Sequence, residues 1–405
     1  MAAEPLLAVD EALRRVLAAA AEPLPAEEVA IEDALDRTLA APLAATRTQP
    51  PFPASAMDGY AVRAADATVG ATLRVIGKAP AGRAFPGKVG PGEAVRIFTG
   101  APVPEGADAI LIQENATPDG DAVTVREGVT AGAFVRSAGL DFRTGEELLA
   151  AGHRLNPRTV ALAAAMGQPR LSVRRKPRVA ILATGDELVR PGEAARPDQI
   201  VTSNSYALAA IARRAGAEPI DLGIAGDTFA ALEGAIETAL AREADVLVTL
   251  GGASVGDHDL VQSALTQRGM QLGFWRIAMR PGKPLIFGQM GAMRILGLPG
   301  NPVASILCGR LFLVPLLRSL QGDPQAGDDP TEPGLLGADI PANDRRQDYL
   351  RARFEPGPDG RPVAFPAAVQ DSSMLRILAQ ADGLVLRPPH APAAKAGEAC
   401  RVLRF

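Results

Sequence analysis

The sequence contains few residues of the kinds that build disulfide-stabilised or soft-metal sites. It has two cysteines and three histidines among 405 residues. Two cysteines, Cys308 and Cys400, are too few for a disulfide framework or a thiolate metal cage. Three histidines, His153, His258 and His390, disfavour a multi-histidine metal centre. We therefore expect carboxylates and lysines to carry most of the chemistry.

Long apolar runs and blocks of like charge are also missing. No stretch approaches the roughly 18 consecutive apolar residues of a membrane-spanning helix, and the N-terminus lacks the basic start and apolar segment of a signal peptide. The net charge is −4, without a run of like charges that would form a nucleic-acid arm. We expect a cytoplasmic protein with neither a membrane nor a nucleic acid as its partner.

Length and composition predict a folded protein of several domains. Hydrophobic residues make up 47% of the chain and charged residues 22%, which is typical of globular proteins. At about 150 residues per domain, a chain of 405 residues is expected to form two to four domains.

The order of patterns along the chain indicates where these domains lie. Helical spacing at residues 6–20 and 157–167 flanks a stretch of short β-prone runs over 46–142. Strand-like and helix-like segments alternate over 175–322, which predicts a mostly parallel sheet covered by helices. A linker rich in Gly, Pro and Asp then leads to short β-prone runs, which predict a small β domain over 323–405.

Three unusual loops follow strand-like runs in the alternating region, at residues 183–188, 251–259 and 298–304. In an open parallel sheet, loops at the carboxyl ends of the strands gather in one crevice, where helix N-termini present free amides. We therefore expect these loops to converge on an anionic ligand. The candidate binding residues in the first and third loops are Thr184, Gly185, Pro299, Gly300, Asn301 and Pro302.

The central loop of the three is rich in glycine. Gly251, Gly252 and Gly256 permit positive φ and close backbone approach, and Ser254 adds a hydroxyl group. The loop is therefore expected to cradle a phosphate, although a tight strand-to-helix turn would use some of the same residues. It lacks the spacing of a dinucleotide-binding fingerprint.

Two other phosphate or hydrolase signatures fit poorly. Pro284 follows Lys283 where a Walker A loop has Ser or Thr, which disfavours P-loop chemistry. GASVG, at 252–256, matches a nucleophile elbow and offers Ser254 as the nucleophile of a serine hydrolase. No later histidine is well placed to complete a triad with it, so this alternative is weaker.

Carboxylates are concentrated in or near the same loops. Side by side they would repel one another unless a cation lay between them, and Mg²⁺ is the cation that commonly bridges carboxylates and phosphate oxygens. Each acid taken singly is also compatible with a capping or loop hydrogen bond. The candidate metal ligands are Asp186, Glu187, Asp227, Asp257 and Asp259.

Further candidates lie in stiff, proline-containing loops. Arg280 and Lys283 flank a Pro-Gly turn, so both cations are placed to face one anion, unless they are simply solvated. Asp58 lies in the loop at 51–62, and a second stiff loop covers 98–109. Long constrained loops often hold sites.

The motifs together resemble the molybdenum insertases of the MoeA and gephyrin E-domain family. The resemblance covers nearly the whole chain, and seven motifs in order make it specific. They are SAMDGYA (55–61), TGAPVPEGADA (99–109), the group Gly139, Asp141 and Phe142, TGDEL (184–188), GGASVGDHD (251–259), RPGKP (280–284) and GLPGNPVA (297–304).

The resemblance implies a multidomain α/β plus β fold. It implies a discontinuous helical connecting domain over 1–45 and 143–174, a β-rich insert domain over 46–142, a three-layer α/β molybdopterin-binding domain over 175–322 and a C-terminal β-barrel domain over 323–405. The implied reaction moves molybdenum from molybdate to the dithiolene of adenylylated molybdopterin and releases AMP with the help of magnesium. Because the pterin supplies the sulfur ligands, no reactive cysteine is required.

The resemblance also implies roles for individual residues. Glu187 and Asp259 match the family's catalytic acids, and Arg280 and Lys283 match its cation pair. The other implied site residues are Asp58, Thr99, Asp141, Asp186 and Asp227, with Arg351 and Ser372 as molybdate contacts.

The sequence departs from the usual family pattern around the implied molybdate pocket. Arg280 stands where many relatives have Lys, Ala304 stands where a Ser often follows the NPV turn, and QDSSML, at 370–375, replaces a more glycine-rich version.

Family members are homodimers whose active site combines the α/β domain of one subunit with the insert domain of the other. The molybdopterin adenylyltransferase is a further candidate partner. A non-catalytic molybdopterin-binding scaffold is the main alternative function, and a tungsten enzyme would share every motif.

Overall fold

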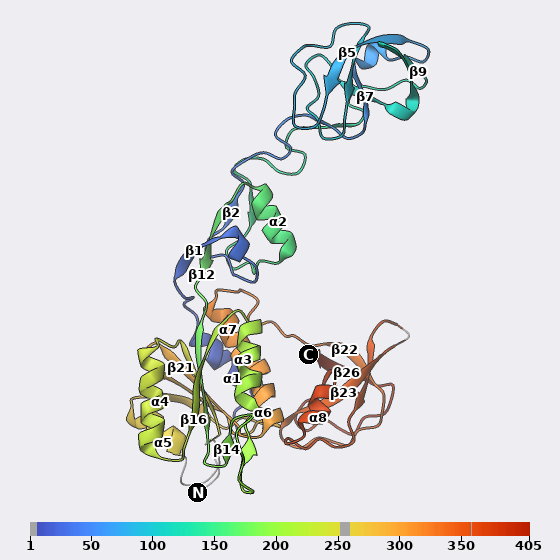
Figure 1. Cartoon of the computed structure of the whole chain (residues 1–405). Helices are drawn as coiled ribbons and strands as arrows, with labels where there is room; N and C mark the ends of the chain where they lie inside the picture. The colour runs from blue at the N-terminus through green and yellow to red at the C-terminus, as the bar shows by residue number, and fades with distance from the viewer. Residues whose placement is uncertain (1–5, 252–259, 358) are drawn as a thin grey trace.

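The computed structural model describes residues 6–251, 260–357 and 359–405 of the chain. The molecule is elongated, with a β-rich part at one end and an α/β part and a β-barrel side by side at the other (Figure 1). This arrangement confirms the expected multidomain α/β plus β fold.

The α/β part is built on a six-stranded sheet in the order β16-β13-β17-β21-β20-β18. The first four strands are parallel, as the alternating pattern predicts, and β20 and β18 are antiparallel additions. The elements are β13 (Arg178–Thr184), β14 (Leu188–Val189), β15 (Ile200–Val201), α3 (Asn204–Arg214), β16 (Glu218–Ala225), α4 (Phe229–Ala241), β17 (Val246–Leu250), α5 (Leu260–Gln267), β18 (Gln271–Trp275), β20 (Ile286–Met290) and β21 (Met293–Leu298), followed by the helical run α6 (Pro302–Cys308), η4 (Gly309–Leu313) and α7 (Val314–Leu320).

The central strands are buried on both faces, which explains their almost continuous apolar sequences. Val179 and Ile181 of β13 face α3 and the α6–α7 run, whereas Ala180 and Leu182 face α4 and α5. The run 302–320 is long and apolar enough to cross a membrane by length and composition, but most of it is buried in this core. Its apolarity is thus explained by packing against the sheet.

The first helix, α1 (Val9–Ala18), belongs to the same core. Val9, Ala12 and Val16 are buried on one face of α1 and pack with Leu316 and Leu320 of α7. The amphipathic helix expected at 6–20 therefore exists, but it packs with the α/β layers and not with the connecting segments with which the sequence grouped it. Its apolar stripe finds the larger buried surface there.

The connecting part contains more strand than the description as helical implies. It consists of two antiparallel ribbons and one α-helix, formed by β1 (Ala26–Ala30), η1 (Ile31–Asp33), β2 (Leu43–Ala44), β11 (Glu147–Leu149), α2 (Pro157–Ala165) and β12 (Arg170–Arg174). Asn156 caps α2, Pro157 occupies its first turn and Gly167 follows its end with φ 87°, as the sequence predicts.

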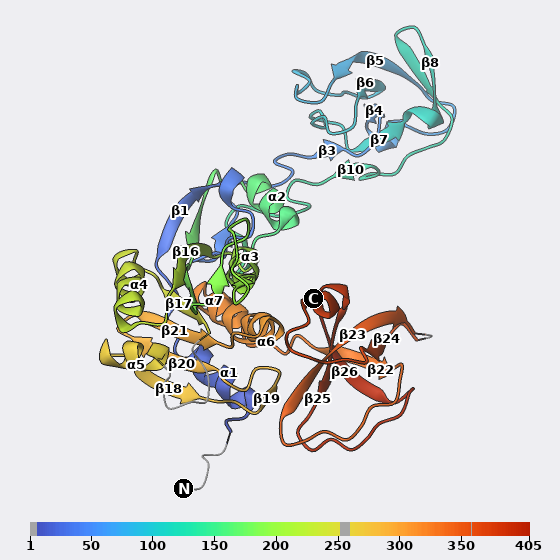
Figure 2. The same cartoon turned by 60° about the horizontal axis from the view of Figure 1, so that its bottom comes forward.

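The insert domain is a six-stranded sheet in the order β7-β4-β6-β5-β9-β8 with an extra two-stranded ribbon. It contains β3 (Ala54–Ser55), β4 (Gly59–Val62), η2 (Ala64–Asp66), β5 (Thr72–Ala79), β6 (Glu93–Ile97), β7 (Ala109–Ile112), η3 (Gln113–Asn115), β8 (Ala116–Asp119), β9 (Ala122–Val125) and β10 (Val135–Arg136). In both views it lies at the far end of the molecule from the α/β part (Figures 1 and 2).

The C-terminal part is a five-stranded barrel, closed because β23 pairs with both β24 and β25. It contains β22 (Glu332–Leu336), β23 (Gln347–Pro356), β24 (Pro362–Pro366), α8 (Leu375–Gln380), β25 (Gly383–Arg387) and β26 (Ala399–Arg404). A sixth strand, β19 (Met279–Arg280), comes from the α/β region and pairs with β23. Residues 279 and 280 therefore join the barrel sheet, although they fall within the expected α/β range.

The carboxylate of Asp245, 9% exposed just before β17, ties the connecting part to the central sheet. It accepts two hydrogen bonds at 2.8 Å from the Arg175 guanidinium and one at 2.8 Å from the backbone N–H of Arg178. We predict that Asp245→Asn lowers the stability of the α/β part by about 2–3 kcal/mol, because Arg175 loses its partner where both groups are largely buried. Thermal unfolding measures the loss.

The matched control is Glu243→Gln, because Glu243 pairs with Arg178 but is exposed to solvent. An exposed pair contributes little, so the midpoint should shift by the equivalent of less than about 0.5 kcal/mol. Equal effects of the two substitutions would contradict the structural role of Asp245.

Candidate functional site

The three loops singled out by the sequence meet at one edge of the sheet. Ala183 of β13 is in register with Leu250 of β17, and Leu250 is in register with Leu298 of β21, so the loops leave the sheet at the same level. They border a cleft of about 800 Å³, within the range of small-molecule sites. The cleft is lined by Thr184, Gly185, Glu187, Asp227, Gly251, Pro299, Gly300, Asn301 and Pro302, among others.

The floor of the cleft depends on backbone contact between neighbouring loops. A Cβ atom at Gly251 would lie 2.9 Å from both the carbonyl oxygen and Oγ1 of Thr184, and Gly251 has φ 100°. Thr184 is buried and donates its hydroxyl hydrogen to the carbonyl oxygen of Leu250 at 3.2 Å. Only glycine satisfies both the close approach and the backbone angle at position 251.

The acids of the first loop stand at the rim of the cleft. The Glu187 carboxylate folds back on Gly185, where a Cβ atom would come within 2.2 Å of Oε2. Asp186 Oδ1 accepts a hydrogen bond of 3.3 Å from the backbone N–H of Asp227, which brings these two exposed acids together. Three of the predicted metal ligands thus share one corner of the site.

These acids fit magnesium in kind, because Mg²⁺ prefers hard oxygen ligands and usually takes only one or two carboxylates together with phosphate oxygens and water. Within the described ranges no three acidic, histidine or cysteine side chains are close enough to form a complete cage. Asp257 and Asp259 lie outside the described residues, as do Gly252, Ser254 and Gly256. The Ser254 nucleophile hypothesis falls on the same undescribed stretch.

The sequence reasoning missed one wall of the cleft. Residues 200–204 line it, and Asn204 Nδ2 donates a hydrogen bond of 2.7 Å to the carbonyl oxygen of Gly300. Asn204 begins α3, and Ser203 before it makes no side-chain cap bond. The polar run Thr202–Asn204 before a helical pattern was the available signal.

The Pro-Gly turn places Lys283 next to the cleft. Pro284 lines the cleft, and a Cβ atom at Gly282 would lie 2.9 Å from Sγ of Cys308, so the turn is seated on α6. Lys283 is half-buried, and no ion pair is seen for it in the part of the chain described. Its charge is therefore available to an anion.

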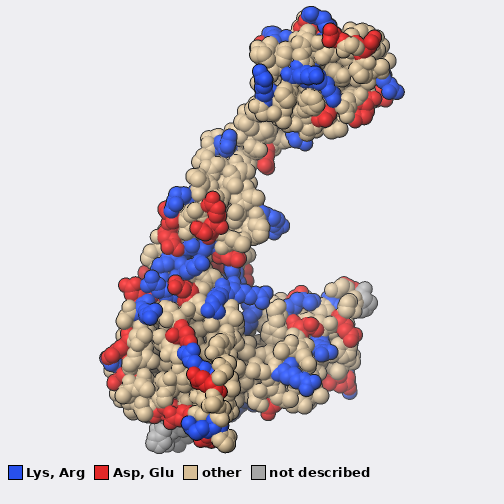
Figure 3. All heavy atoms as spheres, viewed as in Figure 1, with Lys and Arg blue, Asp and Glu red and all other residues tan. Residues whose placement is uncertain are grey.

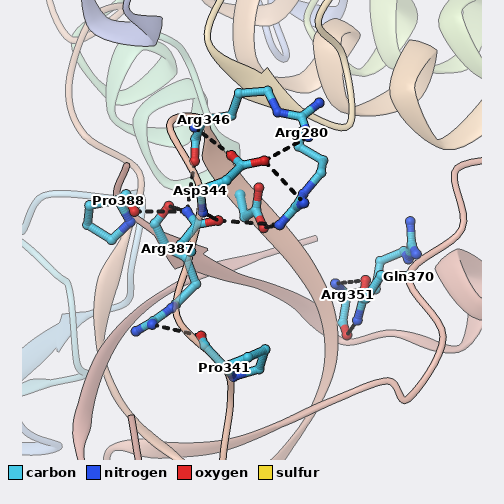
Figure 4. Close-up of polar contacts among 10 residues, drawn as sticks. Arg280, Pro341, Asp344, Arg346, Arg351, Gln370, Arg387 and Pro388 are labelled. Carbon is cyan, nitrogen blue, oxygen red and sulfur yellow. Dashed lines mark hydrogen bonds and ion pairs between the residues drawn. The ribbon is translucent and has the colours of Figure 1, made fainter. Parts of the chain in front are cut away.

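Arg280, by contrast, is engaged by acids of the barrel. Its guanidinium pairs with Asp348 and lies 3.6 Å from Asp344 (Figure 4). The hydrogen bond to the buried Asp348 carboxylate raises the pKa of Arg280. Arg280 lines a separate cavity of about 650 Å³ on the barrel, so its charge is compensated away from the cleft.

Arg351 is fully buried on β23, and its three guanidinium nitrogens have no hydrogen-bond partner among the described residues. Burial lowers its pKa. The Gln370 side chain accepts from the Arg351 backbone N–H and donates to its carbonyl oxygen, both at 3.0 Å (Figure 4). A buried cation without a partner is costly, which marks Arg351 as a candidate for an anion that the chain itself does not supply.

The segment after Gln370 connects Arg351 with the cleft. The carbonyl oxygen of Ser372 accepts a hydrogen bond of 3.0 Å from the N–H of Val303 in the first turn of α6. Ser373, and not the predicted Ser372, is the serine that lines the cleft. The two neighbouring serines could not be told apart from the sequence.

The residues predicted in the insert domain form their own small arrangement. The backbone N–H and the hydroxyl of Thr99 each donate to Asp58 Oδ1 at 2.8 Å, which holds the pKa of this carboxyl below its usual range. Arg96, stacked between the rings of Tyr60 and Phe98, donates to the carbonyl oxygen of Gly59.

This arrangement lies at the opposite end of the chain from the cleft (Figure 1). Asp141, exposed near the start of the return to the connecting part, does not line the cleft either. A single copy of the chain thus brings Asp58, Thr99 and Asp141 no closer to Glu187 than the length of the connecting part allows.

Comparison with known proteins agrees with this architecture. Residues 7–167 match the MoeA N-terminal region (domain I and II), residues 180–319 a probable molybdopterin binding domain and residues 333–405 the MoeA C-terminal region (domain IV).

Similar proteins match over the full length as well. The molybdopterin molybdenumtransferase of Haemophilus influenzae is 32% identical over 401 residues, covering 99% of each chain. That of Nostoc sp. is 42% identical over 294 residues, covering 71% of this chain and 67% of the relative. A crystal structure of the molybdopterin biosynthesis MoeA protein from Pyrococcus horikosii has a TM-score of 0.83 at 32% identity and covers 99% of both chains.

The order of the domains, the glycine-floored cleft and the full-length matches agree with one another. The chain therefore belongs to the MoeA family of molybdopterin molybdenumtransferases, and it is a transferase of molybdenum cofactor biosynthesis that inserts molybdenum.

Proposed function

We propose that the cleft binds adenylylated molybdopterin by its pyrophosphate and that molybdenum insertion is accompanied by release of AMP. The observation that carries this proposal is the meeting of the three loops at one level around Gly251. Bare backbone at Gly251 and Gly300 leaves room for phosphate oxygens, and the polar start of α3 adds amide donors at the same edge.

The acids at the rim would then handle the metal-assisted part of the reaction. Asp186, Glu187 and Asp227 are the described side chains that would hold Mg²⁺, together with Asp257 and Asp259. When bound, the ion would neutralise charge on the pyrophosphate oxygens. Glu187 faces the cleft, where its carboxylate can accept a proton from an attacking water.

Molybdate would be attracted by the cations that have no acid to neutralise them. Lys283 stands beside the cleft, and Arg351 offers a desolvated guanidinium behind the segment that carries Ser372. A guanidinium in a site without water binds an oxyanion more strongly than one on the surface. Arg280 contributes by fixing the turn that carries Lys283.

We further propose that the working site is shared within a homodimer. The Asp58–Thr99 pair is held by hydrogen bonds yet lies far from its own cleft (Figure 1). The insert domain extends on a narrow connection, a shape that suits reaching a second copy. In such a dimer, Asp58 and Thr99 would face the cleft of the partner.

The direct test follows AMP during incubation with adenylylated molybdopterin, molybdate and Mg²⁺. We expect release that depends on molybdate and that stops when EDTA removes the magnesium. In Glu187→Gln, turnover should fall by about a hundredfold or more, while binding of the pterin nucleotide is retained. Glu193→Gln, an exposed acid on the same segment, is the matched control.

AMP release that is indifferent to molybdate would contradict the proposed reaction. Full activity of Glu187→Gln would instead leave the reaction standing and remove Glu187 from it.

A second prediction concerns the buried guanidinium. Arg351→Gln should raise the molybdate concentration for half-maximal AMP release about tenfold or more, because a charge-assisted contact to the oxyanion is lost. Its melting temperature should not fall, since the removed charge has no partner in the chain. Arg353→Gln, an exposed arginine on the same strand, should change neither quantity. A lower melting temperature with unchanged molybdate dependence would assign Arg351 a structural role.

The shared site is tested by complementation. Asp58→Asn and Arg351→Gln chains should each be inactive alone. In a dimer of one of each, one cleft combines an intact barrel with an intact insert domain, so the co-expressed mixture should recover about a quarter of the wild-type activity. Inactivity of the purified mixed dimer would show that each chain builds its site alone.

A further inference from the structure

A second cavity, of about 710 Å³, lies where the connecting part, the α/β part and the barrel meet. One wall is the loop 150–154 before α2, another is the C-terminal end of α3, and a third is the helical run through η4. The cavity shares no lining residue with the cleft. Nothing in the proposed reaction uses it.

Four arginines line this cavity, and two of them are unpaired in the described part of the chain. Arg154 lies 3.4 Å from Asp36, and Arg318 lies 2.7 Å from Asp323. Arg214 and Arg310 have neither an ion pair nor a side-chain hydrogen bond within the described ranges. Figure 3 shows basic side chains gathered on this region of the surface.

Arg310 is the most strained of these charges electrostatically. It is only partly exposed, and burial together with the nearby cations Arg214 and Arg318 lowers its pKa. Uncompensated like charges in a concave, partly desolvated site attract an anion of high charge. Nε2 of His153, which also lines the cavity, is buried without a partner among the described residues.

The walls are held in place by close packing. A Cβ atom at Gly152 would lie 2.6 Å from the carbonyl oxygen of Gly322, and one at Gly309 would lie 2.5 Å from Leu208 of α3. Arg310 sits in the π-helical turn η4, just before Pro315, which lacks an N–H for regular helix bonding. The π-turn therefore sets the direction of Arg310 on a rigid base.

We propose that this cavity is a binding site for a small organic phosphate. Arg214 and Arg310 would bind the phosphate dianion through charge-assisted hydrogen bonds. The apolar side chains of Ile211, Ile306 and Val314 would pack against the organic body of the ligand. The volume suits a ligand of that size, and the position at a three-part junction means that binding would fix the connecting part against the α/β part.

The test compares phenyl phosphate with inorganic phosphate on the full-length protein by calorimetry and thermal shift. Phenyl phosphate should bind more tightly and raise the melting temperature more, because only it contacts the apolar wall. Arg310→Gln and Arg214→Gln should each weaken its binding by at least about tenfold. Arg353→Gln, outside the cavity, should bind like the wild type. Binding that persists in both cavity variants belongs to another site.

Two results would overturn the proposal. One is an affinity for phenyl phosphate that is unchanged in both Arg310→Gln and Arg214→Gln, whatever their stability. The other is equal affinity for inorganic and phenyl phosphate in the wild type, which would remove the organic part of the ligand. Since the ligand-free charges repel one another, at least one variant should melt no lower than the wild type, which keeps the affinity comparison interpretable.

Discussion

The parallel register of β13, β17 and β21 is the constraint on which the cleft depends. Because the three strands end at the same level, their loops open at one edge, and Gly251 must pass against Thr184 with no side chain between them. The register itself follows from strands that are apolar on both faces and are clamped between two helical layers. A shift of one residue would exchange the two buried faces and misalign every loop at that edge.

Much of this could be predicted from the sequence, for physical reasons that differ from place to place. The loops at 183–188 and 298–304 were identifiable because each follows a run of buried β-prone residues, and parallel topology then brings them together. The contribution of Asn204 was not, because its contact with Gly300 depends on where α3 starts in space. The choice between Ser372 and Ser373 likewise depends on a backbone direction that composition does not encode.

Other errors arose where packing overrides local pattern. The first helix joins the larger apolar surface of α7 irrespective of the segment next to it in sequence. The strand β22 contains Pro333 and Gly334, which disguise a barrel strand as part of a linker. Arg280 and Lys283 look alike in sequence, yet Asp348 distinguishes them by neutralising only the first. Such pairings join residues far apart along the chain and leave no local trace.

The two-residue strand β19 has a mechanical consequence. Its hydrogen bonds belong to the barrel, whereas the chain on either side of it belongs to the α/β body, and the turn that follows rests on Cys308 of α6. The barrel is thus fastened to the body at a point next to Lys283 and not only through the linker after α7. Any swing of the barrel must pull on that turn, so the position of the lysine reports the orientation of a whole domain.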